Sequence, residues 1–141
     1  MTRVEFIFNV PDKLAKVTDL CEKAVTKGRQ LTVFTQGDMM NLALNKQLWQ
    51  LSATSFLPSN FPDHAMSKFS PIVLDATGEN LLQDDVLINL QSETPPFFSR
   101  FRYLVELVGH EESDKSAARV RFKFYRDRGY EIKNTDMAEH Q

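Results

Sequence analysis

The first residues of the chain alternate in the manner of a β-strand. Apolar side chains recur at every second position of the stretch 3–10, Ile7 lies between them, and Pro11 ends the run. The alternating positions are Val4, Phe6, Phe8 and Val10. The pattern predicts a strand that is buried on both faces.

The period then changes to that of a helix. Over 12–27 the apolar residues fall within one arc at about 100° per residue, and charged residues fall opposite. The apolar positions are Leu14, Val17, Leu20, Cys21, Ala24 and Val25. The pattern predicts an amphipathic helix that ends at Gly28, a common residue just after a helix.

The remaining pattern continues the alternation of strands and helices. We expect strands over 30–35, 71–75, 86–90, 103–108 and 130–132, and helices over 38–51, 97–102 and 113–128. The stretch 52–70 is expected to be a long loop with one short strand at most, and 133–141 a frayed tail. Strands that alternate with helices predict a single α/β domain over 1–141, with a mostly parallel central sheet flanked by helices.

Composition narrows the class of protein. The chain has 141 residues, 42% hydrophobic and 26% charged, with a formal net charge of −2. That charge gives the whole molecule no electrostatic reason to condense on nucleic acid, so any role on DNA would be local or indirect. Cys21 is the single cysteine, which excludes an internal disulfide and predicts a reducing, cytoplasmic location. No run is long enough for a signal peptide or a membrane span.

An α/β sheet invites comparison with nucleotide-binding enzymes, but the phosphate-binding motifs are absent. The glycines lie at 28, 37, 78, 109 and 129, so neither GxGxxG nor GxxxxGK[ST] occurs. Cys21 lies on the apolar face of its helix, where burial raises the pKa of a thiol and hides it. The histidines at 64, 110 and 140 are far apart, and Asp84-Asp85 is expected to be a turn with an exposed charge. We therefore expect no catalytic residue, no cofactor and no metal.

The last predicted helix carries an unusual face. With 100° per residue, four cations fall within about 80° of one another, and Phe122 falls next to them. These cations are Lys115, Arg119, Lys123 and Arg126. Ala117, Val120 and Phe124 occupy the opposite arc, which is expected to pack on the sheet, so Phe122 is predicted to point away from the core. The face fits a solvated basic surface, a pocket for an acidic peptide, or a phosphate-binding stripe.

The second helix has a comparable feature. Met40, Leu44, Leu48 and Leu51 form one apolar face, whereas Leu42 and Trp49 lie about 140–160° away from Leu44. A tryptophan off the core face is a candidate interface anchor, and Phe56 and Leu57 would extend the same patch. The alternative is a helix that the chain itself covers on two sides.

Several segments together resemble one family. They are Leu48-Trp49, Ser55-Phe56-Leu57-Pro58, Asp85-Val86-Leu87-Ile88-Asn89-Leu90, Ala118-Arg119-Val120-Arg121-Phe122-Lys123-Phe124-Tyr125-Arg126 and Gly129-Tyr130. In this order, and across nearly the whole chain, they resemble the chi subunits of bacterial DNA polymerase III. The resemblance implies an α/β fold like that of nucleotide-binding domains, without catalysis.

The resemblance also implies two partners. Family positions that receive the acidic C-terminal tail of single-stranded DNA-binding protein match Val108, Lys115, Arg119, Phe122 and Lys123, with Gly129 nearby. Positions of the surface that binds psi, the subunit that tethers chi to the clamp loader, match Trp49 and Phe56, with Leu57 adjacent. Phe122 stands where a tyrosine is common, and the stretches 76–84 and 133–141 match poorly.

The resemblance therefore implies a protein at the bacterial replication fork that reaches DNA only indirectly. Two rival interpretations stay open from the residues: a degenerate nucleotide-binding or hydrolytic domain, and a direct binder of single-stranded nucleic acid through the basic helix.

Overall fold

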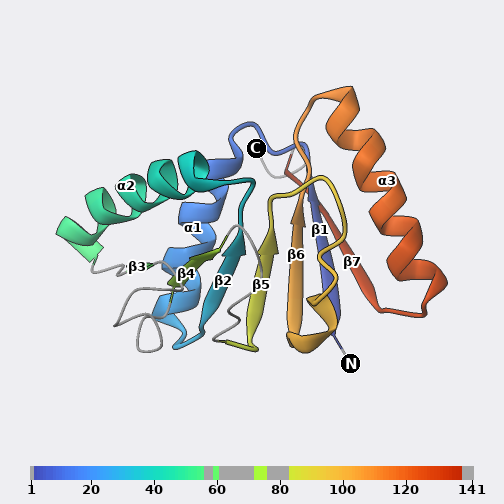
Figure 1. Cartoon of the computed structure of the whole chain (residues 1–141), viewed down its shortest axis with the longest axis horizontal. Coiled ribbons are helices and arrows are strands. Elements are labelled where there is room, and N and C mark those ends of the chain that lie inside the picture. The colour runs from blue at the N-terminus through green and yellow to red at the C-terminus, as the bar shows by residue number, and fades with distance from the viewer. Residues whose placement is uncertain (1, 56–58, 61–71, 76–82, 138–141) are drawn as a thin grey trace.

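The computed structural model describes residues 2–55, 59–60, 72–75 and 83–137, and its centre is a parallel β-sheet (Figure 1). The strands are β1 (Arg3–Phe8), β2 (Leu31–Phe34), β3 (Ser59–Asn60), β4 (Ile72–Asp75), β5 (Val86–Asn89), β6 (Tyr103–Leu107) and β7 (Ile132–Asp136). They form a seven-stranded sheet in the order β3-β4-β2-β5-β6-β1-β7, and each neighbouring pair is parallel. The predicted α/β class and parallel sheet are confirmed.

Among the described residues, three α-helices and one 3-10 helix accompany these strands. They are α1 (Lys13–Thr26), α2 (Asp38–Ser55), η2 (Phe98–Arg100) and α3 (Glu112–Asp127). The carboxylate of Asp12 accepts a hydrogen bond from the amide of Ala15 at the start of α1, and Gly28 follows that helix with φ +74°. Gly129 follows α3 with φ +82°. Both glycines adopt the left-handed conformation that commonly ends a helix. Within the described residues, no helix is long and apolar enough to cross a membrane.

The helices cover opposite faces of the sheet. Side chains of α1 and α2, among them Val17 and Leu44, pack with Ile7 in one hydrophobic cluster. Ala118 and Tyr125 of α3 pack with Phe6, the neighbour of Ile7 on β1, in a second cluster. Successive strand residues point to opposite faces, so the sheet separates two cores. The crossover through α1 runs from β1 toward β2, and the crossover through α3 runs from β6 in the opposite direction along the sheet, toward β7. Because such crossovers are right-handed, their helices lie on opposite faces.

Several expected boundaries need correction. The helix expected to end near Leu51 continues to Ser55, so the start of the predicted 52–70 loop is helical. Residues 133–136, expected to be frayed, form most of β7. The side chain of Asn9 donates to Asp136 at 2.8 Å, and the hydroxyl of Thr135 donates to Glu5 at 2.9 Å. These bonds anchor a polar strand that has no alternating apolar pattern to reveal it.

The first strand is not buried on both faces along its length. Val4 and Phe6 are buried on the side of α3, but Arg3 is exposed and Glu5 is half-buried on the side of α1. Of the residues on that second side, only Ile7 is buried. Consequently the two faces of β1 differ, and this difference recurs on β6.

The predicted rotation of α3 about its axis is wrong. Val120, expected to pack on the sheet, is 71% exposed, whereas Ala118, Arg121 and Tyr125 are buried. The buried face includes an arginine, which a hydrophobic pattern assigns to solvent. The reason is a charged partner on the sheet.

Candidate functional site

A buried polar network fixes α3 against the sheet. Glu106 on β6 and Arg121 on α3 form an ion pair at 3.0 Å, with side-chain exposures of 0% and 3%. The hydroxyl of Tyr125 donates to Glu106 at 2.6 Å, and the side-chain amide of Asn89 donates to the same carboxylate. Arg121 also donates to the carbonyl oxygen of Ser92 at 2.7 Å. Both charged groups are thus paired and hydrogen-bonded, as buried charges must be.

The electrostatics of this network depend on burial. Burial is the largest influence on Glu106 and raises its pKa above the usual value, although the charge of Arg121 and the bonds from Tyr125 and Asn89 act in the opposite direction. Burial and the neighbouring carboxylate also raise the pKa of Tyr125, which keeps the phenol protonated as a donor. The network therefore determines which residues of α3 face solvent.

In the observed rotation of α3 about its axis, Phe122 lies at the border between the core and the solvent. Its ring is partly buried, and its centroid is 5.3 Å from that of Phe6, which in turn stacks on Phe8 at 5.8 Å. The prediction that Phe122 points away from the core is therefore wrong in part, because one side of the ring packs inward. The other side lines a surface hollow.

This hollow, which we call the α3 hollow, has a volume of about 340 Å³. Its lining consists of Phe8, Ala118, Arg119, Phe122, Lys123 and Arg126. Two aromatic rings supply its apolar surface, and three cations surround them. Phe8 comes from the end of β1, and the other five come from successive turns of α3.

The cations around the hollow remain available to a ligand. Arg119 lies 3.3 Å from Glu112, but both side chains are mostly exposed, at 67% and 76%. Exposed pairs of this kind contribute little and exchange readily with other anions. Arg126 is paired in a similar way with Asp127, and the described residues include no ion-pair partner for Lys123. An aromatic floor with exposed guanidinium groups suits a ligand that combines a carboxylate with an apolar group.

The structure brings together only half of the residues expected at this site. Arg119, Phe122 and Lys123 line the α3 hollow, whereas Val108 is 1% exposed and belongs to the core cluster on the side of α3. Lys115 lies on α3 outside the lining, and Gly129 follows the far end of the helix. Phe8 and Ala118 were missed as lining residues. The signal for Phe8 was its position at the end of β1, in the same alternating register as Val4 and Phe6.

The second expected surface is described only in part. Trp49 belongs to α2, but its side chain, like Phe56 and Leu57, lies outside the described residues. On the same helix Leu44 and Leu48 are buried, while Met39 and Leu42 are 85% and 61% exposed. The described part of α2 thus has a buried apolar face and two large apolar side chains in solvent.

The crevice at the carboxyl ends of β1 and β6 is the usual ligand site of such a sheet. These strands are neighbours, and their following helices lie on opposite faces. A hollow of about 540 Å³ is present there, and Asp114 in the first turn of α3 lines it. The carboxylate of Asp114 accepts a hydrogen bond from the amide of Gly109 at 2.6 Å and pairs with Lys13 at 2.7 Å.

Asp114 occupies the position where a nucleotide-binding domain places a phosphate, at the first turn of a helix. Burial acts to raise the pKa of Asp114, but the bonds from Lys13 and Gly109 outweigh it, and the pKa lies below the ordinary value. The carboxylate is therefore charged at neutral pH. The carboxylate already accepts the amide of Gly109 and pairs with Lys13, and its negative charge would repel an incoming phosphate.

Two further expectations concern single residues. Cys21 is fully buried, and burial raises the pKa of its thiol to about 12, as predicted for a core cysteine. Asp85, expected to carry an exposed charge, instead accepts hydrogen bonds from Arg29 and from the amide of Gln30. The bond from Arg29 is the main cause of its lowered pKa. Asp85 thus joins the start of β5 to the start of β2.

The fold and the hollow together define a parallel α/β domain whose surface site suits a short anionic and apolar peptide better than a nucleotide. Comparison with known proteins then gives the family. The family model described as "DNA polymerase III chi subunit, HolC" matches residues 1–133. The chain belongs to this family and is thereby an accessory subunit of DNA replication.

Individual relatives agree with this family assignment. The chain is 30% identical to the DNA polymerase III subunit chi of Pseudomonas aeruginosa over 138 residues, which cover 95% of this chain and 96% of that protein. It is 29% identical to the subunit chi of Haemophilus influenzae over 78% of this chain and 77% of that protein. It is 28% identical to the subunit chi of Escherichia coli (strain K12) over 86% of each chain.

Proposed function

We propose that this chain is a non-catalytic subunit that binds the acidic C-terminal tail of single-stranded DNA-binding protein and connects it to the clamp loader of DNA polymerase III at the replication fork. The observation that carries the proposal is the α3 hollow, where Phe8 and Phe122 lie among Arg119, Lys123 and Arg126. A peptide that ends in an apolar residue has a carboxylate next to that side chain. The hollow offers a guanidinium group next to an aromatic ring.

The proposal gives the charged and aromatic lining residues the following roles. Arg119 would pair with the terminal carboxylate or with acidic residues of the tail, and Lys123 and Arg126 would add attraction. Phe122 and Phe8 would contact the apolar end, and Lys115, one turn before Arg119, would extend the positive potential along the tail. Val108, which is buried in the core, would not contact the peptide.

The affinity should be modest and salt-dependent. A few exposed charges and one shallow apolar contact correspond to a Kd on the order of micromolar, or about −8 kcal/mol. Because the cations are exposed, raising the ionic strength should weaken binding. Several tails on one coated DNA strand would increase the effective affinity through multivalency.

Charge reversal at Arg119 tests this role. Arg119→Glu should abolish binding of a synthetic acidic tail peptide in isothermal titration calorimetry, since it replaces an attraction by a repulsion. Lys46→Glu is a control with the same change of net charge, because Lys46 is exposed on α2, on the other face of the sheet, and should leave the affinity unchanged. The mutation should barely alter the thermal melt, as Arg119 is exposed. Normal affinity of Arg119→Glu would remove this residue from the site.

The second part of the proposal concerns α2. Trp49, Phe56 and Leu57 would form the apolar surface for psi, which tethers the subunit to the clamp loader. Exposure of Met39 and Leu42 supports an apolar surface on the solvent side of this helix. Trp49→Ala should prevent co-purification with psi or the clamp loader, while Arg119→Glu should not. Retention of the complex by Trp49→Ala would mean that the tryptophan belongs to the core.

The charged state of Asp114 supports the absence of nucleotide chemistry. Equilibrium dialysis with ATP and GTP should detect no binding at the carboxyl-end crevice. The rival in which α3 binds single-stranded DNA directly predicts retention of the pure protein on an oligonucleotide. The proposal instead predicts retention only when single-stranded DNA-binding protein is also present.

A further inference from the structure

The amino-terminal halves of β1 and β6 are covered on one face only. On the side of α3, Val4 of β1 and Leu104 of β6 are buried, at 2% and 0% exposure. On the side of α1, Arg3 is exposed, and Glu5, Tyr103 and Val105 are only partly buried. Both strands lie in the interior of the sheet, yet no helix of the described part of the chain lies over this half of them.

Such an open face is unusual for this kind of sheet. Parallel sheets occur almost always with both faces covered, because their strands are joined by helices that pack on them. β2 and β4 of the same sheet follow the rule, with every residue of each strand buried. Over this part of β6, β1 and β7, the described residues therefore supply no layer of the kind that covers β2 and β4.

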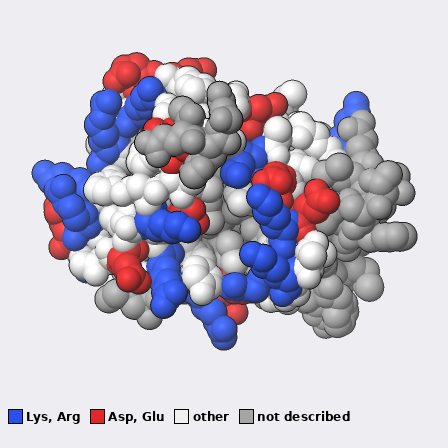
Figure 2. Space-filling model, turned by 180° about the vertical axis from the view of Figure 1, so that it is seen from behind, with Lys and Arg blue, Asp and Glu red and all other residues white. Residues whose placement is uncertain are grey.

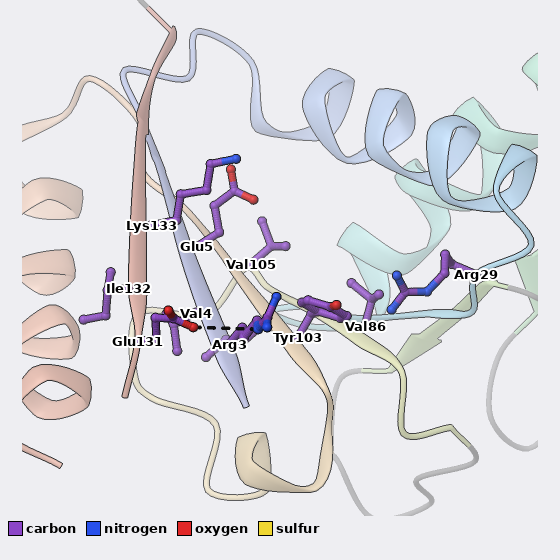
Figure 3. A pocket seen from close by; sticks show the side chains of 11 residues that line it. Arg3, Val4, Glu5, Arg29, Val86, Tyr103, Val105, Glu131, Ile132 and Lys133 are labelled. Carbon is purple, nitrogen blue, oxygen red and sulfur yellow. Dashed lines mark ion pairs between the residues drawn. The ribbon is translucent and has the colours of Figure 1, made fainter. Parts of the chain in front are cut away.

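The open face forms a shallow hollow of about 660 Å³ beside α1. Glu5, Val105 and Lys133, from three neighbouring strands, point into it from the sheet (Figure 3). Tyr103 and Val86 lie toward the amino ends of β6 and β5, and they add apolar surface. We call this surface the open strip.

Cations gather at the amino-terminal end of the open strip. A neighbouring hollow of about 320 Å³ is lined by Arg3, Arg29, Arg102 and Tyr103. Arg29 is committed to Asp85 and lies over the ring of Tyr103 at 4.7 Å. Arg3 has only an exposed contact with Glu131 at 3.7 Å, and Arg102 is exposed. Figure 2 shows this side of the molecule, with Lys and Arg side chains spread across it and fewer acids among them.

The dimensions and charges indicate what would cover the strip. β6, β1 and β7 span two inter-strand spacings, roughly 10 Å, which is about the diameter of one α-helix. Val105 and Val86 pack only partly against the core and Tyr103 is only partly buried, so some apolar surface stays open, and the exposed Arg3 and Arg102 can each pair with a carboxylate. Glu5 and Glu131 lie beside these cations and would repel a phosphate backbone, but they can pair with a basic residue of a protein.

We propose that the open strip is a docking surface for one amphipathic helix of another protein of the DNA polymerase III assembly. The apolar side of the helix contacts Tyr103 and Val105, and acidic residues at one of its ends pair with Arg3 and Arg102. The helix completes the missing layer of the sheet. This surface lies on the face opposite α3, so it is independent of the tail proposal.

Photo-crosslinking within the intact assembly tests the proposal. A photoreactive amino acid replaces Val105 in the full chain, the chain is assembled into purified DNA polymerase III holoenzyme of the same organism, and the crosslinked peptide is identified by mass spectrometry. We expect a peptide from an acidic, amphipathic helix of another protein. Because Val105 is partly buried, a second variant with the photoreactive residue at the exposed position of Lys133 guards against misfolding.

The charge contacts are tested in the same experiment. Arg102→Glu should lower the crosslink yield about tenfold, the effect of losing one charge-assisted contact. Arg119→Glu and Lys46→Glu should leave the yield unchanged, which separates this surface from the α3 hollow and from α2. A crosslink to DNA, to a second copy of this chain, or to no partner at either position would overturn the proposal, as would an Arg102→Glu yield equal to that of the unaltered chain.

Discussion

Replacing Arg121 by methionine would leave Glu106 as an unpaired charge in the core. Methionine keeps the unbranched stem of the arginine and much of its volume, so the change removes mainly the guanidinium group. The lost contacts are the ion pair with Glu106 at 3.0 Å and the bond to the carbonyl oxygen of Ser92 at 2.7 Å. Tyr125 and Asn89 still donate to the carboxylate and limit the damage.

The expected loss in the free energy of unfolding is large for a single substitution. Breaking a fully buried pair by removing one partner costs about 3–5 kcal/mol, because the remaining charge keeps its desolvation penalty. Urea unfolding at pH 7, followed by circular dichroism, measures the change. Lys123→Met removes an exposed cation from the same helix and should cost less than about 0.5 kcal/mol.

The direction in which the free energy of unfolding changes with pH follows from the pKa of Glu106. Its pKa is raised in the folded protein, so the folded state binds the proton more tightly than the unfolded state. Stability from this group is present at low pH and is lost as the pH rises through the folded pKa. Removing Arg121 removes one of the influences that lower this pKa. The deficit of Arg121→Met should therefore be smaller at low pH, where the carboxyl group of Glu106 is protonated, than at higher pH.

A double variant isolates the charge. Glu106→Gln combined with Arg121→Met should be more stable at pH 7 than Arg121→Met alone by at least about 1 kcal/mol, since no charge remains buried. The reasoning is refuted if Arg121→Met costs less than about 1 kcal/mol, or if its cost is the same at every pH and in the presence of Gln at position 106.

Three smaller predictions concern other parts of the fold. Arg29→Ala should lower the free energy of unfolding by about 0.5–1 kcal/mol at pH 7, and this difference should shrink as the pH falls through the lowered folded pKa of Asp85, measured by urea unfolding in acid and neutral buffer. Native Cys21 should react with a thiol reagent at pH 8 only as fast as the chain unfolds, because its thiol is buried with a pKa of about 12. Gly129→Ala should lower stability by about 1 kcal/mol because φ is +82°, and the thermal melt of Gly37→Ala, where φ is not positive, provides the control.

The regular elements could be predicted because their patterns are local. The alternation in 3–10 and the helical period in 12–27 depend on neighbours in the sequence, and β1 and α1 follow them within one or two residues at most boundaries. β7 was missed beyond Ile132 because its stability comes from pairing with β1 and from side-chain bonds to Asn9 and Glu5. These partners are more than a hundred residues away in the sequence.

The face of α3 could not be predicted from its period alone. A hydrophobic pattern treats Arg121 as exposed, and its partner Glu106 belongs to a different element. The one available signal was Glu106 itself, an acid in the middle of the apolar strand 103–108. Of the four cations of the predicted basic stripe, Arg119, Lys123 and Arg126 are exposed as expected, whereas Lys115 is only partly exposed.

The width of the sheet sets the distance between its two edge strands, β3 and β7. α2 adjoins β3 and β4 at one edge, and β7, to which α3 leads, forms the other. Seven strands leave six spacings of about 4.8 Å, or roughly 29 Å, joined by continuous backbone hydrogen bonding. Molecules held at the two edges would therefore be kept roughly that far apart by the hydrogen-bonded sheet, without colliding.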